Sequence, residues 1–252
     1  MRIVICGSFV LGLLLAAMAT VRGDAQADAK GVIDKAIKAV GSEEKIAKYK
    51  AFTMKGKGKI NLMGNDIEFT FDAAVQLPKQ VRQRSEADFN GMKFERIQIV
   101  NGDKGWVCLM GNTEEMSEDQ LEAAKDGLYA DWVATLLPLK DAAFQLAPLA
   151  EIKVGDRPAV GIKVSHKGHK DLSLYFDKDK GLLLKIQRRT KDMTGQEVDQ
   201  ETFFTDYKDD NGVQRAKKQK TKRDGNDFVD IEIAEFKPAE KLDESTFAKP
   251  QG

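Results

Sequence analysis

Apolar and polar side chains alternate strictly from residue 67 to residue 77 of this 252-residue chain. The apolar members of the run are Ile67, Phe69, Phe71, Ala73, Val75 and Leu77. A period of two over this length is typical of a long β-strand with one apolar face and one solvated face. Similar alternation recurs later, between turns rich in Gly, Asp and Asn. The sequence therefore predicts a large, curved antiparallel sheet, and its function depends on what covers the apolar face.

The N-terminus resembles a secretory signal peptide. Its apolar stretch, residues 3–19, is short for a bilayer span and is followed by small residues. Cleavage after Ala27 or after Ala19 fits the small-x-small rule, and we favour Ala27 because a helical pattern begins at Asp28. A retained N-terminal anchor helix is the alternative. We expect the mature protein in the periplasm or secreted.

The mature chain, residues 28–252, reads as a single domain, because no linker rich in Pro, Gly or Ser interrupts it. Its single cysteine, Cys108, permits no intrachain disulfide and is expected in the core. Forty Lys plus Arg balance forty Asp plus Glu over the full chain, so we expect no nucleic-acid partner. We expect a monomer.

Helical patterns stand at the start and in the middle of this domain. Residues 28–48 predict one or two helices, with Gly41 ending the first and Ser42 capping the second. A mid-chain helix opens with a capping box at Ser117 and Gln120, and its apolar face is wide. Residues 141–149 predict a further helical or irregular piece.

Two details of the strands shape the predicted sheet. Gly56 and Gly58 stand on the apolar side of a strand from Phe52 to Leu62, which indicates a sharp coil or the close approach of a helix. Apolar positions change parity near Glu95, which predicts a bulge there.

Candidate catalytic residues are few. The only histidines, His166 and His169, lie at a predicted hairpin tip without an evident third metal ligand, so we interpret them as solvated turn residues rather than a zinc site. A metal-dependent hydrolase would need carboxylates converging on that tip. No nucleophile elbow, phosphate loop or redox cysteine pair occurs. We expect no enzyme activity, no catalytic residue, no metal and no cofactor.

Three local stretches resemble the LolA-like proteins, the outer-membrane lipoprotein-sorting family of periplasmic lipoprotein carriers. They are Leu77-Pro78 with Arg82; the turn and tryptophan strand from Asn101 to Val107; and Asp206-Tyr207 with Gly212-Val213 and the closing segment from Leu242 to Pro250. The resemblance spans most of the mature chain. The sequence departs from the family at Arg215-Ala216, where a proline is frequent, and in its lysine-rich first strands.

This resemblance implies a mainly β fold with helices (α+β): an unclosed antiparallel β-barrel, or half-barrel, with an N-terminal helix and a mid-chain helical lid. It also implies a concave apolar trough that holds a lipid or the acyl chains of a lipoprotein. The candidate trough residues are Phe52, Met54, Ile60, Leu62, Phe69 and Phe71, and the candidate lid residues are Leu128, Trp132 and Leu136. Arg82 matches the family arginine that steadies the lid, and Arg84 is an equal candidate.

The resemblance therefore implies a non-catalytic binding protein for transport in outer-membrane biogenesis. Burial of an acyl chain contributes about 0.8 kcal/mol per methylene, so a trough needs no polar recognition to bind one. The alternative is an envelope module that binds another protein, with a filled core and no lipid. The two hypotheses differ in whether a cavity remains under the lid.

Overall fold

Thirteen β-strands form one antiparallel sheet in the part of the chain that this computed structural model describes, residues 14–62, 64–89, 91–192 and 195–250. The strands are β1 (Ala51–Leu62), β2 (Asn65–Gln76), β3 (Gln80–Phe89), β4 (Met92–Asn101), β5 (Lys104–Leu109), β6 (Asn112–Glu115), β7 (Phe144–Val154), β8 (Arg157–His166), β9 (Leu172–Asp177), β10 (Leu183–Lys191), β11 (Glu197–Asp210), β12 (Val213–Arg223) and β13 (Asn226–Ala239). Their spatial order is β6-β5-β4-β3-β2-β1-β13-β12-β11-β10-β9-β8-β7. Because β6 and β7 are unpaired edges, the barrel is not closed, which confirms the predicted half-barrel.

The helices are α1 (Leu14–Val40), α2 (Glu43–Ala47) and α3 (Glu118–Ala134), with short 3₁₀ helices η1 (Leu137–Lys140) and η2 (Glu244–Phe247). The caps of α2 and α3 are the predicted ones, whereas α1 begins at Leu14 rather than at the predicted Asp28. The Ser42 hydroxyl accepts a hydrogen bond from the backbone of Lys45, and Ser117 and Gln120 form a reciprocal capping box. Leu136, with φ of 70°, separates α3 from η1.

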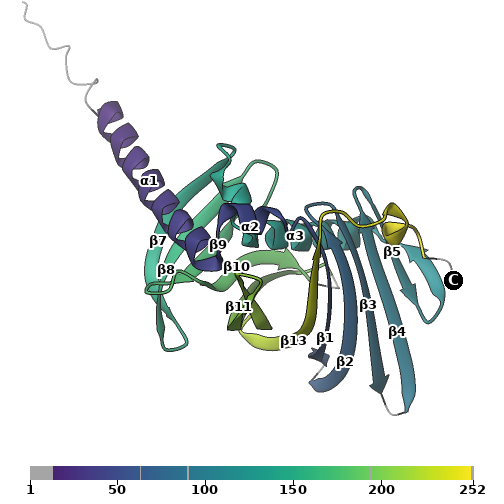
Figure 1. Ribbon diagram of the computed structural model, residues 1–252. Coiled ribbons are helices and arrows are strands. Elements are labelled where there is room, and N and C mark those ends of the chain that lie inside the picture. The colour runs from purple at the N-terminus through teal and green to yellow at the C-terminus, as the bar shows by residue number, and fades with distance from the viewer. Residues whose placement is uncertain (1–13, 63, 90, 193–194, 251–252) are drawn as a thin grey trace, which may run out of the picture.

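The sheet bends around the helices. Figure 1 shows α2 and α3 lying between strands β7–β10 on one side and β1–β5 on the other. The first turns of α1 extend beyond the sheet, and its later turns pack along β7. The backbone N–H of Leu146 on β7 donates to Oε1 of Gln26, 2.8 Å away. Of the predicted signal peptide, residues 1–13 lie outside the described residues.

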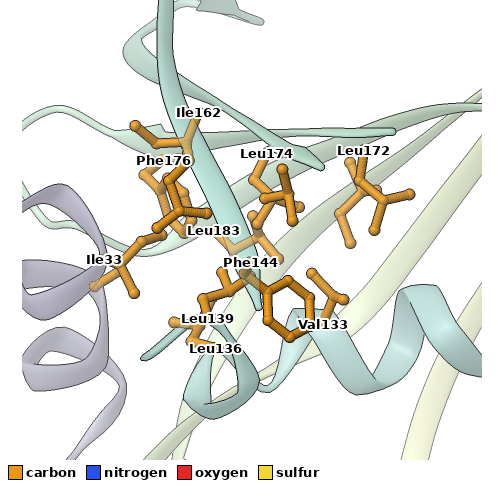
Figure 2. Packing of buried hydrophobic residues seen from close by; sticks show 14 of the residues in the cluster. Ile33, Val133, Leu136, Leu139, Phe144, Ile162, Leu172, Leu174, Phe176 and Leu183 are labelled. Atoms are coloured by element: carbon orange, nitrogen blue, oxygen red, sulfur yellow. The ribbon is translucent and has the colours of Figure 1, made fainter. Parts of the chain in front are cut away.

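The largest apolar core lies where α1, α3 and η1 meet strands β7–β10 (Figure 2). Its fully buried members in the figure include Ile33 of α1, Val133 of α3 and Phe176 of β9. A side chain of this size contributes about 1.5–3 kcal/mol when buried. The core therefore fixes both helices on one half of the sheet.

The other half of the sheet has apolar packing on both faces. The inner face, which α3 covers, carries Val75 and Val100 beneath Leu128. The outer face carries Ala74 and Ile99 beneath Phe247 of η2. In the structure β4 pairs with β3 and β5 without a register shift, so the predicted bulge near Glu95 is wrong. The change of parity arises because both faces of β4 are apolar.

The prediction of a helical or irregular segment over residues 141–149 is also wrong. From Phe144 onward this segment is strand β7, whose Phe144 and Leu146 are buried against the core. A register shift between Leu149 and Ile152 breaks the alternation that would have revealed it. Pro148 is tolerated because β7 is an edge strand.

Candidate binding site

Helix α3 joins the two halves of the open sheet. Leu121, Ala124 and Leu128 of its first turns pack on the inner face with Val75. Tyr129 and Val133 of its later turns, together with Trp132, belong to the core on strands β7–β10. The predicted lid residues Leu128 and Trp132 thus lie on opposite halves, and Leu136 follows in the turn after α3. Chain connectivity requires this crossing, since α3 follows edge strand β6 and precedes edge strand β7.

Charged side chains also hold α3 to the sheet. The ammonium group of Lys191 on β10 lies 2.8 Å from Asp119 and 3.0 Å from Glu122 of α3. The hydrogen bonds to Asp119 and Glu122 raise the pKa of Lys191 above its ordinary value. Lys125 of α3 pairs with Asp103 at 2.5 Å. No pattern in the sequence singled out Lys191 for this contact.

Arg82, the predicted lid-steadying residue, lies on the outer face. It is opposite Ala74 and Ile99 in the ladder, and its guanidinium is 3.4 Å from Asp72. Arg84 shares that face and donates to Glu95, which lowers the pKa of the Glu95 carboxyl. In the part of the chain described, both guanidinium groups therefore form ion pairs with carboxylates of the neighbouring strands β2 and β4, on the face of the sheet away from α3.

A cavity of about 250 Å³ lies beneath the end of α3. Its walls come from α1, α2 and the segment after it, from strands β1, β2 and β10–β13, and from α3 with the turn that follows. The lining residues are Val40, Ile46, Tyr49, Phe52, Met54, Val75, Leu77, Asp131, Ala134, Thr135, Leu136, Leu183, Phe204, Tyr207, Val213, Gln214, Arg215, Ala216, Lys217, Gln219, Ile233 and Phe236. Most of this lining is apolar. Small-molecule sites usually measure about 300–1,000 Å³, so the cavity is slightly small for a ligand of that class.

The predicted trough residues divide into three groups along the inner face. Phe52 and Met54 line the cavity under α3. Phe69 and Phe71 lie further along β2, where their rings cover Gly58 and Gly56 of the neighbouring strand β1. These aromatic rings, and not a helix, therefore approach the two glycines closely. Phe69 also lines a wider open depression of about 670 Å³.

Ile60 and Leu62 lie at the far end of the same face. Ile60 is half-buried beside Ile67, and Leu62 is 38% exposed. Strand register places three further exposed apolar side chains on this inner face: Met92, Phe94 and Leu109. The apolar surface thus continues from the cavity to the free tips of strands β1–β5, where it is open to solvent.

Asp131 of α3 is the acidic residue of the cavity lining. Water reaches its side chain, but the surrounding protein desolvates the carboxylate and raises its pKa to about 6, against the opposing attraction of Arg188. Desolvation likewise raises the pKa of Asp126, one turn earlier on α3. Sequence reasoning missed Asp131, because a single acid on a helix gives no signal of its own.

Both histidines lie at the β8–β9 hairpin tip, as predicted, and His169 is exposed, but their rings also stack on other aromatic side chains. The ring of His169 stacks on Tyr129 of α3 with centroids 3.7 Å apart, and the ring of His166 stacks on Phe144 at 4.3 Å. Desolvation lowers the pKa of His169. The β8–β9 hairpin tip is therefore an aromatic contact for α3.

Neither a metal-ion cluster nor a membrane-spanning helix occurs among the described residues. In that part of the chain, no three His, Cys, Asp or Glu side chains gather closely enough to hold a metal ion. None of the helices described there combines the length and apolar character needed to cross a membrane. Cys108 is buried and free, as predicted for a core residue.

Comparison with known proteins gives matches in structure alone. No family model matches the sequence, and no curated protein matches it. A LolA superfamily protein from Nitrosomonas europaea aligns with a TM-score of 0.57 and 10% identity, covering 88% of this chain and 97% of that one. A DUF1329 family protein from Desulfovibrio piger gives a TM-score of 0.53 and 14% identity over 87% and 97% of the two chains.

A third solved structure carries a more specific description. It is a domain from Vibrio parahaemolyticus assigned to outer-membrane lipoprotein sorting, with a TM-score of 0.51, 12% identity and coverage of 82% of this chain and 94% of that one. At such identities the likeness concerns the fold alone. The open thirteen-stranded sheet crossed by α3 is therefore a LolA-like half-barrel, as the sequence motifs predicted.

Proposed function

We propose that this protein is a non-catalytic carrier of the cell envelope, which holds a lipid or the acyl chains of a lipoprotein against the inner face of its sheet. The observation that supports this most is the apolar cavity under α3, continued by exposed apolar side chains along the same face. The signal-peptide pattern at the N-terminus supports a periplasmic or secreted location. The description of the Vibrio relative is consistent with a client bound for the outer membrane.

The size of the cavity determines how an acyl chain could bind. Burying about eight methylenes contributes about 6 kcal/mol, enough for useful affinity without polar contacts. A cavity of about 250 Å³ leaves little room for such a chain. Binding therefore requires α3 to lift from β1 and β2, and the ion pairs of Lys191 with Asp119 and Glu122 are among the contacts that hold α3 in the closed form. We infer an open, loaded form and the closed form described above.

A cavity-filling variant tests this proposal. Ala134 of α3 lines the cavity, so Ala134→Trp should occupy the space that an acyl chain needs. Ala147 is exposed on β7 away from the cavity, so Ala147→Trp is the matched control. The measurement is native mass spectrometry of protein purified from its own envelope without detergent, followed by lipid extraction. We expect a bound acyl species in the wild type and in the control, and its loss in Ala134→Trp.

The opposite result has an equally clear meaning. A wild-type protein that emerges without ligand and takes up no added lipid would contradict the carrier proposal. It would favour the alternative, an envelope module that recognises another protein. One observation supports that alternative: Phe71 is only 6% exposed with its ring over Gly56, so this part of the inner face is already filled.

A further inference from the structure

Arg215 of β12 is a cation in the wall of an otherwise largely apolar cavity. Its guanidinium carbon lies 4.0 Å from the ring centroid of Tyr49 and 3.8 Å from that of Phe236. Cation–π contacts of this kind stabilise a guanidinium that has lost part of its water. The edge of the group, with its N–H donors, is left as the part that can bind another molecule.

The donors of Arg215 are not all satisfied within the described residues. There, Nε and Nη2 are buried and have no hydrogen-bond partner. The Asp210 carboxylate is 3.5 Å from Nε, whereas a charge-assisted hydrogen bond is typically about 2.7–2.9 Å. Desolvation lowers the pKa of Arg215, and the Tyr49 hydroxyl and Asp210 oppose this change. Buried donors without acceptors are costly, so an acceptor that gains access to them as the cavity opens would be bound with a gain.

The two other charged side chains of the cavity lining, Lys217 and Asp131, come from different elements. Lys217 lines the cavity from the same strand as Arg215, while Asp131 lines it from α3. An anionic group would therefore be attracted to the β12 wall and repelled from the lid. The apolar side chains of Met54 and Phe204 are also part of this lining.

We propose that the ligand of this cavity is an amphiphile with an anionic head group, a carboxylate or a phosphate, whose oxygens accept hydrogen bonds from Arg215. This inference rests on the proposed function, since it assumes that an acyl chain enters the cavity. Hydrogen bonds from Arg215 would let the site distinguish ligands by their head groups, which burial of the acyl chain alone cannot do. The fork of Arg215 suits the paired oxygens of a carboxylate or phosphate better than the single charge of a lysine would.

The test compares three dodecyl compounds that share one chain: dodecanoate, dodecyl phosphate and dodecanol. Binding to the wild type, Arg215→Gln and Arg215→Lys is measured by titration calorimetry at pH 8. A hydrogen-bonded charge should favour the anions over the alcohol by about ten-fold to one hundred-fold in the wild type. Arg215→Gln should remove that preference for the anions over dodecanol, whereas Arg215→Lys should keep part of it.

Each outcome decides a separate point. Equal binding of all three compounds by the wild type would overturn the anionic head group and leave the carrier proposal standing. No binding of any compound would reject the carrier proposal itself. A stronger response to dodecanoate indicates a fatty acid, and a stronger response to dodecyl phosphate indicates a phospholipid head group. Should Arg215→Gln fail to fold, the comparison of anions with alcohol in the wild type still tests the inference.

Discussion

At the scale of single residues, Gly56 and Gly58 of β1 leave space on the inner face for the rings of Phe71 and Phe69. An ideal Cβ on Gly56 would lie 2.7 Å from the ring of Phe71 and 2.3 Å from the carbonyl oxygen of Glu232. A side-chain ring can shift, but a backbone oxygen paired in the sheet cannot easily do so. Glycine at this position therefore allows both the strand pairing and the aromatic cover.

A pair of Gly→Ala variants tests this account. Gly56→Ala should lower the free energy of unfolding by about 1–3 kcal/mol, because the added methyl group overpacks the contact with Glu232 and Phe71. A methyl group added at Gly127 of α3 would meet no heavy atom within 4 Å, so Gly127→Ala should raise stability by up to about 1 kcal/mol. Urea unfolding measures both. Equal effects of the two changes would contradict the explanation.

At the scale of elements, α3 depends on an aromatic stack for its position. Tyr129 of α3 contacts both histidines, and His166 in turn contacts Phe144 of β7. The hydroxyl of Tyr129 and Nδ1 of His166 are buried without hydrogen-bond partners in the described residues. Protonation of His169 would place a charge in a contact where the surrounding protein has removed part of its water.

Acid should therefore weaken this contact. Desolvation lowers the pKa of His169 below 6.5, helped by His166 and opposed by Asp126. As the pH falls from 6.5 to that lower pKa, the unfolded chain takes up the proton first, and stability falls. Asp131 has the opposite sign, because its pKa of about 6 is above that of an unfolded aspartate, so acid favours the folded form there.

A substitution separates the two effects. His169→Phe keeps an aromatic ring against Tyr129 and removes the titration, while Asp131 is unchanged. We expect the wild type to lose stability relative to His169→Phe as the pH falls through 6.5, with the two equally pH-dependent well above that pH. Chemical unfolding at each pH, followed by tryptophan fluorescence, measures the difference. Parallel pH profiles throughout would exclude this role of His169.

The sequence predicted the elements better than it predicted the site. Strands such as β2 follow a local period of two, and α3 begins at a local capping box, so both are readable from neighbouring residues. The face on which Arg82 lies depends on a ladder with other strands, and the surroundings of Arg215 depend on Tyr49 and Phe236, which are distant in sequence. Such contacts have no local signal.

At the scale of the whole molecule, the position of signal-peptide cleavage decides which residues of α1 remain in the folded protein. We expect cleavage after Ala27, so intact-mass measurement of the exported protein should show a chain that begins at Asp28. Cleavage there removes Gln26 and its contact with Leu146 but retains Ala29, which is fully buried. A chain that begins at Thr20 would identify the alternative site, and an unprocessed chain would support the anchor helix.

The neighbours of β1 have a consequence for how this protein is made. Ala51 is paired with Ala239, so the first strand to leave the ribosome is completed by the last. Until β13 emerges, β1 has a free edge in the middle of the future sheet, and free edges invite pairing with other chains. Pairings between such distant segments also form slowly. The unfinished chain must therefore be protected from aggregation until β13 has emerged.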